Sequence, residues 1–416
     1  MTFTPRRRNR SSRLENHSPM PEKIGVLFIV AQEAFGADSA VHADIMRNLD
    51  RDRFSVHIAC TDGGGGAVPA SLAVMQSIPN AALRVTRFAP SLRQRNVQAL
   101  WQGVRSTVEL SRDFMALRRY IAREGIRIVH STERPRDSAY NIGLSKLTGA
   151  RSIVHVHVKW SEQYSRLARW GVERADAVFS ISRYVTDTLI RMGRSPATIH
   201  TVLNGIETSK WSPDIDGAEL RRELGILPGT LVLTSVSRLF SWKGQRELIQ
   251  AFALVRAQIP NVELLIVGAD DRLVEANSFT AELKSLALRL GVQDHVRFTG
   301  ARSDIPRVMA ASDLFALPSF EEPFGLVFLE AMAMQKAVVA VNNGGTPEVV
   351  EHGRAGLLSP PWDVPALAAN IVTLLSDADL RARMGEYGRA QVLERFSARR
   401  MARDAATAYE LVLNQR

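Results

Sequence analysis

The stretch from residue 319 to residue 348, SFEEPFGLVFLEAMAMQKAVVAVNNGGTPE, joins a predicted helix to an apolar strand and a Gly-Gly-Thr-Pro-Glu turn. Pro323 can occupy the first turn of a helix at no hydrogen-bonding cost, and good helix formers follow over residues 324–334. This places Glu322 at the helix N-terminus and Glu330 about two turns inside. At a rise of about 1.5 Å per residue the two carboxylates lie roughly 12 Å apart along the axis, so they cannot share one metal ion. They suit two parts of one long ligand.

The N-terminus of this predicted helix is a second binding feature. The free N–H groups of Phe324, Gly325 and Leu326 are expected to point outward at the positive end of the helix dipole, where phosphates and electron-rich hydroxyls bind. Gly345 and Thr346 precede a proline that can open a short helix, whose N-terminus adds another phosphate-facing group. A tight Gly-Gly turn accounts for the same residues without any ligand.

Outside this stretch, the chain alternates apolar runs with helical segments. In the first half, strands are predicted at residues 23–30 and 54–60 with a helix at 37–49 between them, and similar units recur to residue 157. After residue 204 a second series has predicted strands at 231–236, 262–267, 296–299, 314–317 and 337–341. The pattern predicts an α/β fold of two doubly wound, Rossmann-like parallel-sheet domains that face each other across a cleft.

Composition agrees with two folded domains. The 416 residues are 45% hydrophobic and 23% charged, which is ordinary for a globular protein and enough for two cores. Cys60 is the single cysteine, so internal disulfides and cysteine-based metal sites are excluded, and its apolar strand predicts a core position. No apolar run approaches the roughly 18 residues of a membrane span, and residues 1–20 lack the hydrophobic segment of a signal peptide. A cytoplasmic location is expected.

Positive charge is concentrated in the first half. Residues 1–205 contain 30 lysines and arginines against 17 acidic residues, whereas the remainder has a net charge of −3. Five arginines among Ser, Pro and Asn predict a disordered basic arm at residues 1–20. Residues 83–127 hold ten further arginines with interleaved apolar side chains. Two interpretations stay open for them, a solvated helix face or a surface for an anionic membrane or polyanionic acceptor.

Several motifs of the second half resemble one known family. They are NGIETSKWSP at 204–213, SRLFSWKGQRELIQAF at 237–252, PNVELLIVG at 260–268, HVRFTGARSDIPRVMAASDLFALPS at 295–319, and the opening stretch. In this order they resemble the donor-site signature of family 4 glycosyltransferases (glycosyl transferases group 1), which are retaining, sugar-nucleotide-dependent enzymes of GT-B fold. The resemblance covers roughly half of the chain, from Asn204 to about Phe396. Because the pair Glu322 and Glu330 occurs within this ordered series of motifs, it is a more specific signal than two glutamates alone.

The resemblance implies a role for each donor-site residue. Arg238 and Lys243 clamp the diphosphate and stabilise the negative charge that develops as it leaves. Glu322 contacts the hydroxyls of the transferred sugar, and Glu330 holds the ribose. Gly268 ends a predicted strand and lets the nucleotide approach the backbone, with a plain turn glycine as the equal alternative.

On the first-domain wall, the sequence RSIVHVHVKW places His155 and His157 on the same face of a strand. In the resembled family a histidine here lies near the reacting carbon of the sugar, which assigns that role to His157 and leaves His155 as structural. Gly36 lies where the family has a Gly-Gly loop that touches donor and acceptor, but Phe35 replaces one glycine. The resemblance also implies domains at residues 21–203 and 204–397. Residues 398–416 are expected to cross back onto the first domain.

The predicted chemistry needs no metal ion or other cofactor. Asp-x-Asp pairs occur at Asp50/Asp52, Asp214/Asp216 and Asp377/Asp379, all beside predicted turns or helix starts, and none is interpreted as a metal site. Double displacement requires a carboxylate nucleophile at the reacting carbon, and no first-domain acid stands out. The family interpretation is a front-face transfer with retained configuration, in which the leaving phosphate helps deprotonate the acceptor hydroxyl.

The predicted function is transfer of a sugar from a UDP- or GDP-sugar to a hydroxyl of a glycan, lipid-linked glycan or small molecule. Two alternatives remain, a sugar-nucleotide epimerase of similar shape and a non-catalytic, membrane-attached subunit of a glycan-assembly complex. If the basic N-terminal half binds an anionic membrane, the protein is expected to be peripheral on the inner face of that membrane. Nucleic-acid binding is not expected, because no recognised module accompanies the basic half.

Overall fold

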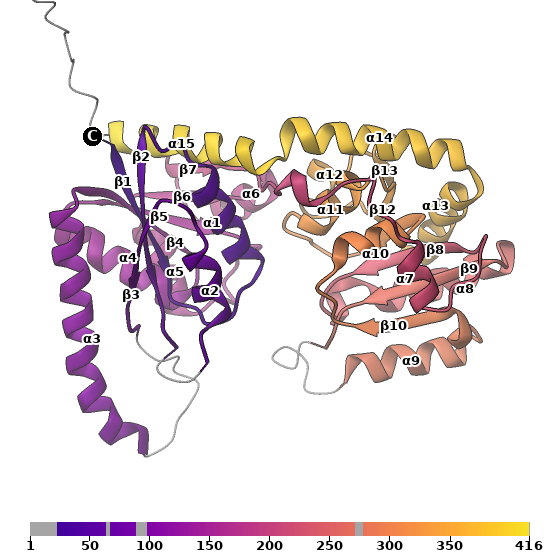
Figure 1. Ribbon diagram of the computed structural model, residues 1–416, viewed down its shortest axis with the longest axis horizontal. Helices are drawn as coiled ribbons and strands as arrows, with labels where there is room; N and C mark the ends of the chain where they lie inside the picture. The colour runs from indigo at the N-terminus through magenta and orange to yellow at the C-terminus, as the bar shows by residue number, and fades with distance from the viewer. Residues whose placement is uncertain (1–22, 64–66, 89–97, 271–277, 416) are drawn as a thin grey trace, which may run out of the picture.

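The computed structural model describes residues 23–63, 67–88, 98–270 and 278–415, with side chains omitted for residues 98–109. The predicted basic arm at residues 1–20 lies outside these ranges. The described residues form two α/β domains side by side, each built on one parallel sheet (Figure 1). This confirms the predicted pair of parallel-sheet domains.

The sheet of the first domain has the strand order β3-β2-β1-β4-β5-β6-β7. Its strands are β1 (Ile24–Val30), β2 (Phe54–Cys60), β3 (Ala81–Val85), β4 (Ile126–Thr132), β5 (Arg151–Val156), β6 (Ala177–Ser180) and β7 (Ile199–Thr201). All of these neighbours pair in parallel. Their carboxyl ends therefore lie along one edge of the sheet, where ligands of doubly wound domains bind.

The sheet of the second domain has the order β10-β9-β8-β11-β12-β13, also with parallel pairing. Its strands are β8 (Leu231–Val236), β9 (Val262–Val267), β10 (Val296–Gly300), β11 (Leu314–Leu317), β12 (Val338–Val341) and β13 (Gly356–Ser359). Five of them begin within one residue of the predicted positions. The short strand β13 was not predicted.

Helices cover both faces of each sheet (Figure 1). In the first domain they are α1 (Ala37–Asn48), α2 (Ala70–Gln76), α3 (Gln98–Arg123), α4 (Pro135–Thr148), α5 (Arg166–Arg174) and α6 (Arg183–Arg191). In the second they are α7 (Ala218–Glu223), α8 (Gln245–Gln258), α9 (Phe279–Arg289), α10 (Ile305–Ala311), α11 (Leu326–Ala333), α12 (Thr346–Val349), α13 (Val364–Ser376) and α14 (Ala378–Arg395). Four short 3-10 helices occur at Pro196–Thr198, Thr208–Lys210, Ser241–Lys243 and Gln293–His295 in the described part of the chain.

Strand β1 shows how the central strands become buried on both sides. Val26 and Phe28 pack into one hydrophobic cluster, and Leu27 and Ile29 pack into another on the opposite face of the sheet. Side chains alternate along a strand, so a strand with helices on both faces must be apolar throughout. This requirement explains the uninterrupted apolar run that made β1 predictable.

The last helix, α15 (Ala398–Asn414), leaves the second domain and lies along the first (Figure 1). Met401, Ala405 and Tyr409 belong to the same hydrophobic cluster as β1 and β2. The hydroxyl of the fully buried Tyr409 lies 2.6 Å from Nδ1 of His130 on β4. The C-terminal residues therefore complete the core of the domain that begins the chain.

One predicted helix boundary is wrong. Helix α11 begins at Leu326, with Gly325 as its N-cap, instead of including Pro323 and Phe324. Gly325 has φ 86°, and an added Cβ there would lie 2.4 Å from the ring of Phe328. The left-handed glycine directs the chain away from the helix axis, so Phe324 belongs to the preceding loop. The N–H groups at the helix start belong to Leu326 and Val327.

Candidate active site

A cleft of about 1570 Å³ lies between the two domains. It opens where the carboxyl ends of the strands of both sheets meet. The first domain contributes Gly36, Asp38, His157 and Lys159, and the second domain contributes Arg238, Lys243, Gly268, Glu321, Glu322, Phe324, Gly325, Leu326 and Glu330. Ten of the twelve residues predicted for catalysis or donor binding thus line one cavity, although they come from five separate stretches of sequence. Gly345 and Thr346 are not among the lining residues.

Two cationic side chains follow β8 on the second-domain wall. Arg238 lies just beyond the strand, with its guanidinium carbon 5.0 Å from the centre of the Phe240 ring. Lys243 ends the short 3-10 helix, and its Nζ lies 4.1 Å from the centre of the Trp242 ring. Aromatic rings hold cations in place without neutralising them. The wall therefore places two cationic side chains at the cleft.

Glu322 is the partner of Lys243. Its Oε2 accepts a hydrogen bond from Lys243 Nζ at 2.6 Å and another from Ser319 Oγ at 2.9 Å. The residue is 7% exposed, so water competes little for this carboxylate. A sugar hydroxyl entering the cleft would find a carboxylate and an ammonium group in contact.

Gly345 and Thr346 pack against the loop that carries Glu322, on the side away from the cleft. The Gly345 N–H donates to the carbonyl of Glu322 at 2.7 Å, and an added Cβ on Gly345 would lie 2.3 Å from the carbonyl oxygen of Pro323. Thr346 is fully buried at the start of α12. The expected phosphate-facing N–H of Gly345 is therefore occupied within the protein, and the glycine is explained by close packing.

Glu330 lies on α11 and borders the cleft. Part of its surface remains exposed, yet burial raises the pKa of its carboxyl to about 7. The N-terminus of the same helix also reaches the cleft at Leu326 and Val327, whose N–H groups lie in the first turn and have no intrahelical acceptor. One helix thus presents N–H donors at its start and an acidic side chain further along.

The two predicted glycines at the cleft have steric reasons of their own. Gly268 has φ 150°, and a Cβ there would lie 1.8 Å from the carbonyl oxygen of Ser237. Close approach of the chain after β8 therefore already requires this glycine. Gly36 is the N-cap of α1, and a Cβ there would lie 2.9 Å from Oδ1 of Asp38.

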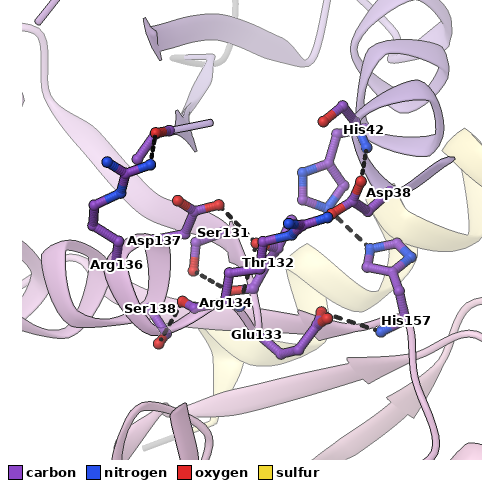
Figure 2. A network of polar contacts seen from close by, with 12 residues as sticks. Asp38, His42, Ser131, Thr132, Glu133, Arg134, Arg136, Asp137, Ser138 and His157 are labelled. Atoms are coloured by element: carbon purple, nitrogen blue, oxygen red, sulfur yellow. Dashed lines mark hydrogen bonds and ion pairs between the residues drawn. The ribbon is translucent and has the colours of Figure 1, made fainter. Parts of the chain in front are cut away.

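His157 follows β5 and faces α1 across the first-domain wall (Figure 2). Its backbone N–H donates to Oε2 of Glu133 at 3.3 Å, and its ring Nε2 lies 3.5 Å from Nε2 of His42. Burial lowers the pKa of His157 to about 4, with Arg134 acting in the same direction and Asp38 opposing it. The imidazole is therefore neutral near pH 7.

Asp38 is a cleft residue that the sequence reasoning missed. It lies two residues after Gly36 on α1, and its Oδ2 accepts from Arg134 Nε at 2.8 Å (Figure 2). Its Oδ1 accepts from the Ser39 N–H at 2.9 Å. Burial alone would raise the pKa of Asp38, but the charges of Arg134 and the interaction with His157 lower it overall. Only its position two residues after Gly36, at the start of the predicted helix, could have indicated it.

Direct contacts join the domains at the edge of the cleft. Lys159 Nζ, two residues after His157, lies 2.5 Å from Oε2 of Glu321. The Ser182 hydroxyl donates to the carbonyl of Pro323 at 2.8 Å. The loop that carries Glu322 is therefore tied to the first domain on both sides of this residue.

A third contact is made by Glu348 of α12. Its two carboxylate oxygens accept from the N–H groups of Arg183 and Tyr184, each at 2.8 Å. These N–H groups belong to the first turn of α6, where a helix favours an anion. A side chain of the second domain thus caps a helix of the first.

Two family models match most of the chain. Residues 36–205 match a glycosyl transferase 4-like domain, and residues 216–391 match glycosyl transferases group 1. The chain is 33% identical over 292 residues to the GDP-mannose-dependent alpha-(1-6)-phosphatidylinositol monomannoside mannosyltransferase of Mycolicibacterium smegmatis, spanning 63% of this chain and 74% of the relative. It is 31% identical over 249 residues to the N-acetyl-alpha-D-glucosaminyl L-malate synthase of Bacillus anthracis, spanning 60% of this chain and 63% of that relative.

Solved structures show the same architecture. HepE of Anabaena, in complex with UDP and glucose, matches with a TM-score of 0.76 at 26% identity, over 93% of this chain and all of HepE. The sucrose-phosphate synthase of Thermosynechococcus elongatus shares the fold, with a TM-score of 0.73 at 22% identity, over 94% of this chain and 99% of the synthase. Two parallel-sheet domains around a shared cleft define the GT-B class of glycosyltransferases, as predicted. The chain belongs to the family of group 1 glycosyl transferases, glycosyltransferase family 4.

No described helix combines the length and the apolar character that a bilayer span requires. The basic segment at residues 83–127 is described only in part. Within it, the guanidinium carbon of Arg84 lies 4.4 Å from the centre of the Tyr120 ring, and Arg87 forms a 3.6 Å ion pair with Asp62. These two arginines therefore have partners within the protein.

Proposed function

We propose that this protein transfers a sugar from a UDP- or GDP-sugar to an acceptor hydroxyl, with retained configuration and without a metal ion. The observation that carries the proposal is the convergence of Arg238, Lys243, Glu322 and Glu330 with His157 around one cleft. The mannosyltransferase relative is named for GDP-mannose, and HepE is bound to UDP-glucose, so both bases are retained as donors.

The donor is proposed to lie along the second-domain wall. Arg238 and Lys243 neutralise the diphosphate as its bond to the sugar breaks, which is charge stabilisation at the position where charge develops. The N-terminal N–H groups of α11 face the same anion. Glu330 accepts hydrogen bonds from the ribose hydroxyls. Two cationic side chains and a helix terminus supply the positive charge that a divalent ion supplies elsewhere.

The Lys243–Glu322 ion pair supports a role for Glu322 in holding the sugar. Oε2 of Glu322 is occupied by Lys243 and Ser319. The proposed sugar hydroxyls displace Lys243 from Oε2 toward the diphosphate. Binding of the donor thereby moves the ammonium group from carboxylate to phosphate, so that its charge is available as the leaving group departs.

The first-domain wall supports front-face transfer over double displacement. Asp38 is a first-domain carboxylate lining the cleft, and both of its oxygens are engaged, by Arg134 and by the Ser39 N–H. A carboxylate held this way is a poor nucleophile, because attack requires it to give up an ion pair. His157, neutral near pH 7, can accept a hydrogen bond from a sugar hydroxyl near the reacting carbon.

The acceptor is proposed to be a hydroxyl compound that enters from the first-domain side. The names of the relatives include an N-acetyl-alpha-D-glucosaminyl L-malate synthase, D-inositol 3-phosphate glycosyltransferases and a phosphatidylinositol monomannoside mannosyltransferase. These range from small molecules to lipid-linked glycans. Peripheral binding to an anionic membrane stays a prediction, and cosedimentation with phosphatidylglycerol vesicles, compared with phosphatidylcholine vesicles, measures it directly.

The test is release of nucleoside diphosphate in the presence of excess EDTA. A panel of UDP- and GDP-sugars is incubated with malate, inositol phosphate and phosphatidylinositol as candidate acceptors. The Arg238→Ala variant, which lacks one of the proposed diphosphate-binding cations, is assayed beside the wild type. We expect acceptor-dependent release by the wild type and at least about 100-fold less by the variant.

Conversion of the sugar nucleotide without diphosphate release would identify an epimerase. A folded wild type that binds no donor would favour the non-catalytic subunit, and activity abolished by EDTA would overturn metal independence.

A further inference from the structure

A cluster of histidines lies directly behind the cleft wall. His42 on α1, His155 on β5 and His157 after β5 place one ring nitrogen each within 4.8 Å of one another. His42 is 1% exposed and His155 is 0% exposed, whereas His157 is half-buried and borders the cleft. The donor-site chemistry proposed above uses only His157 of these three.

The geometry of the cluster is close to that of a metal site. The Nε2 atoms of His42 and His157 are 3.5 Å apart. Two imidazole nitrogens at about 2.05 Å from a tetrahedral Zn²⁺ lie about 3.3 Å from each other. His155 and His157 are two residues apart on one face of the chain, with ring centres separated by 4.2 Å. Small side-chain rotations would bring all three nitrogens to one ion.

His155 supplies an independent observation. Within the described part of the chain, neither of its ring nitrogens has a hydrogen-bond partner, although the side chain is completely buried. A neutral imidazole carries one donor and one acceptor, and leaving both unpaired costs free energy that a phenylalanine at the same position would not incur. Stacking on His42, with ring centres 5.3 Å apart, accounts for the ring but not for its nitrogens. A bound cation would satisfy one of them.

The electrostatic setting also suits a metal ion. Burial, together with the neighbouring histidine, lowers the pKa of His42 to about 3 and that of His155 well below its usual value, so both rings are neutral at pH 7. Metal ions bind the neutral ring. Asp38 lies beside His157 and His42, and its negative charge offsets part of the charge of a cation (Figure 2).

We propose that His42, His155 and His157 form a binding site for Zn²⁺ or a similar transition-metal ion, with a fourth coordination position that opens to the cleft. Occupation engages the Nε2 of His157, the atom next to His42, and withdraws it from the donor sugar. The bound ion therefore inhibits transfer. Three protein ligands with an open fourth position are a common arrangement for zinc. The metal site goes beyond the proposed function, and its occupation is measured without a donor. A negative result for the metal site therefore does not bear on the proposed transfer reaction, and the reverse also holds.

The experiment is a Zn²⁺ titration of the full-length, metal-stripped protein against a chromophoric chelator, with visible absorption of bound Co²⁺ as a second readout of tetrahedral coordination. The variants are His42→Gln and His155→Gln. His200→Gln is the matched control, because His200 is half-buried on β7 and also has an unpartnered Nε2. Circular dichroism and melting curves check that each protein is folded.

We expect one tight equivalent of Zn²⁺ per chain in the wild type and in His200→Gln, with a raised melting temperature. His42→Gln and His155→Gln are expected to bind at least about tenfold more weakly. If these buried substitutions unfold the protein, Zn²⁺ binding by the half-buried variant His157→Gln is measured instead, and the same weakening is expected. Equal affinity in the wild type and in the folded cluster variants would overturn the proposal, as would a wild type without stoichiometric binding. Nucleoside diphosphate release is expected to fall with Zn²⁺ in the wild type and the control alone.

Discussion

Lys243 and Glu322 form the central ion pair of the donor wall, and both are nearly buried. Replacing Lys243 with Met leaves a carboxylate without its main partner, which is expected to lower the free energy of unfolding by about 1–3 kcal/mol. The double variant Lys243→Met/Glu322→Gln removes the uncompensated charge and is expected to recover part of the loss. Denaturant unfolding of the two single variants and the double variant measures this coupling. Additive effects would show that the pair is not formed.

Glu330 has a pKa raised to about 7, and this value predicts how donor binding depends on pH. Ribose hydroxyls donate to the ionised carboxylate, so binding favours the deprotonated form. Donor affinity is therefore expected to rise between pH 5.5 and 7, by up to about tenfold per unit, and to level off above the pKa. Calorimetric titration of the nucleotide sugar, whose diphosphate does not titrate in this range, measures it. Glu330→Gln serves as the control and is expected to show no such rise, whereas an affinity that falls toward pH 7 would mean that Glu330 binds as the acid.

At the scale of elements, the two domains meet through a helix cap. Glu348 on α12 accepts from the first two N–H groups of α6. Glu348→Gln removes the charge and one acceptor, and is expected to cost about 0.5–2 kcal/mol of stability. Glu351→Gln is the control, because Glu351 pairs only with Tyr387 and Arg354 of its own domain among the described residues. Denaturant midpoints compare the two, and equal midpoints would show that the cap does not contribute.

The sequence predicted strands best where a local run of apolar residues was enough to define them. The strands β8, β9 and β11 have the predicted bounds, because apolar runs between polar turns are required of strands buried on both faces. The short strand β13 has only four residues, too few for its pattern to stand out. The start of α11 was wrong because Pro323 permits a helix, whereas the left-handed Gly325 prevents one.

The sequence predicted those candidate-site residues that lie within the motifs of the family. Arg238, Lys243, Glu322 and Glu330 lie in motifs that the sequence displays directly. His42 and Asp38 lie on a helix whose pattern gives no sign of them, because they come to lie beside His155 and His157 only when α1 packs next to β5. Contacts of this kind depend on tertiary structure and cannot be obtained from spacing alone.

At the scale of the whole molecule, the C-terminal helix joins the end of the chain to its beginning. Tyr409 of α15 is buried against His130, and Tyr409→Phe leaves Nδ1 of His130 without its partner. We expect a loss of about 1–3 kcal/mol in the free energy of unfolding. Tyr387→Phe on α14 is the matched control, since its hydroxyl contacts Glu351 at the surface and should cost less. A larger loss in the control would contradict the assigned role of α15.

The central claim is that the cleft binds a nucleotide sugar along the second-domain wall, and thermal-shift binding tests it most directly. The wild type, Arg238→Ala and Glu330→Ala are compared against UDP-, GDP-, ADP- and CDP-sugars without divalent metal. We predict stabilisation of the wild type by donors of one base, increasing with concentration, and loss of that stabilisation in both folded variants. A folded wild type that no nucleotide sugar stabilises, or variants that respond like the wild type, would contradict the donor site.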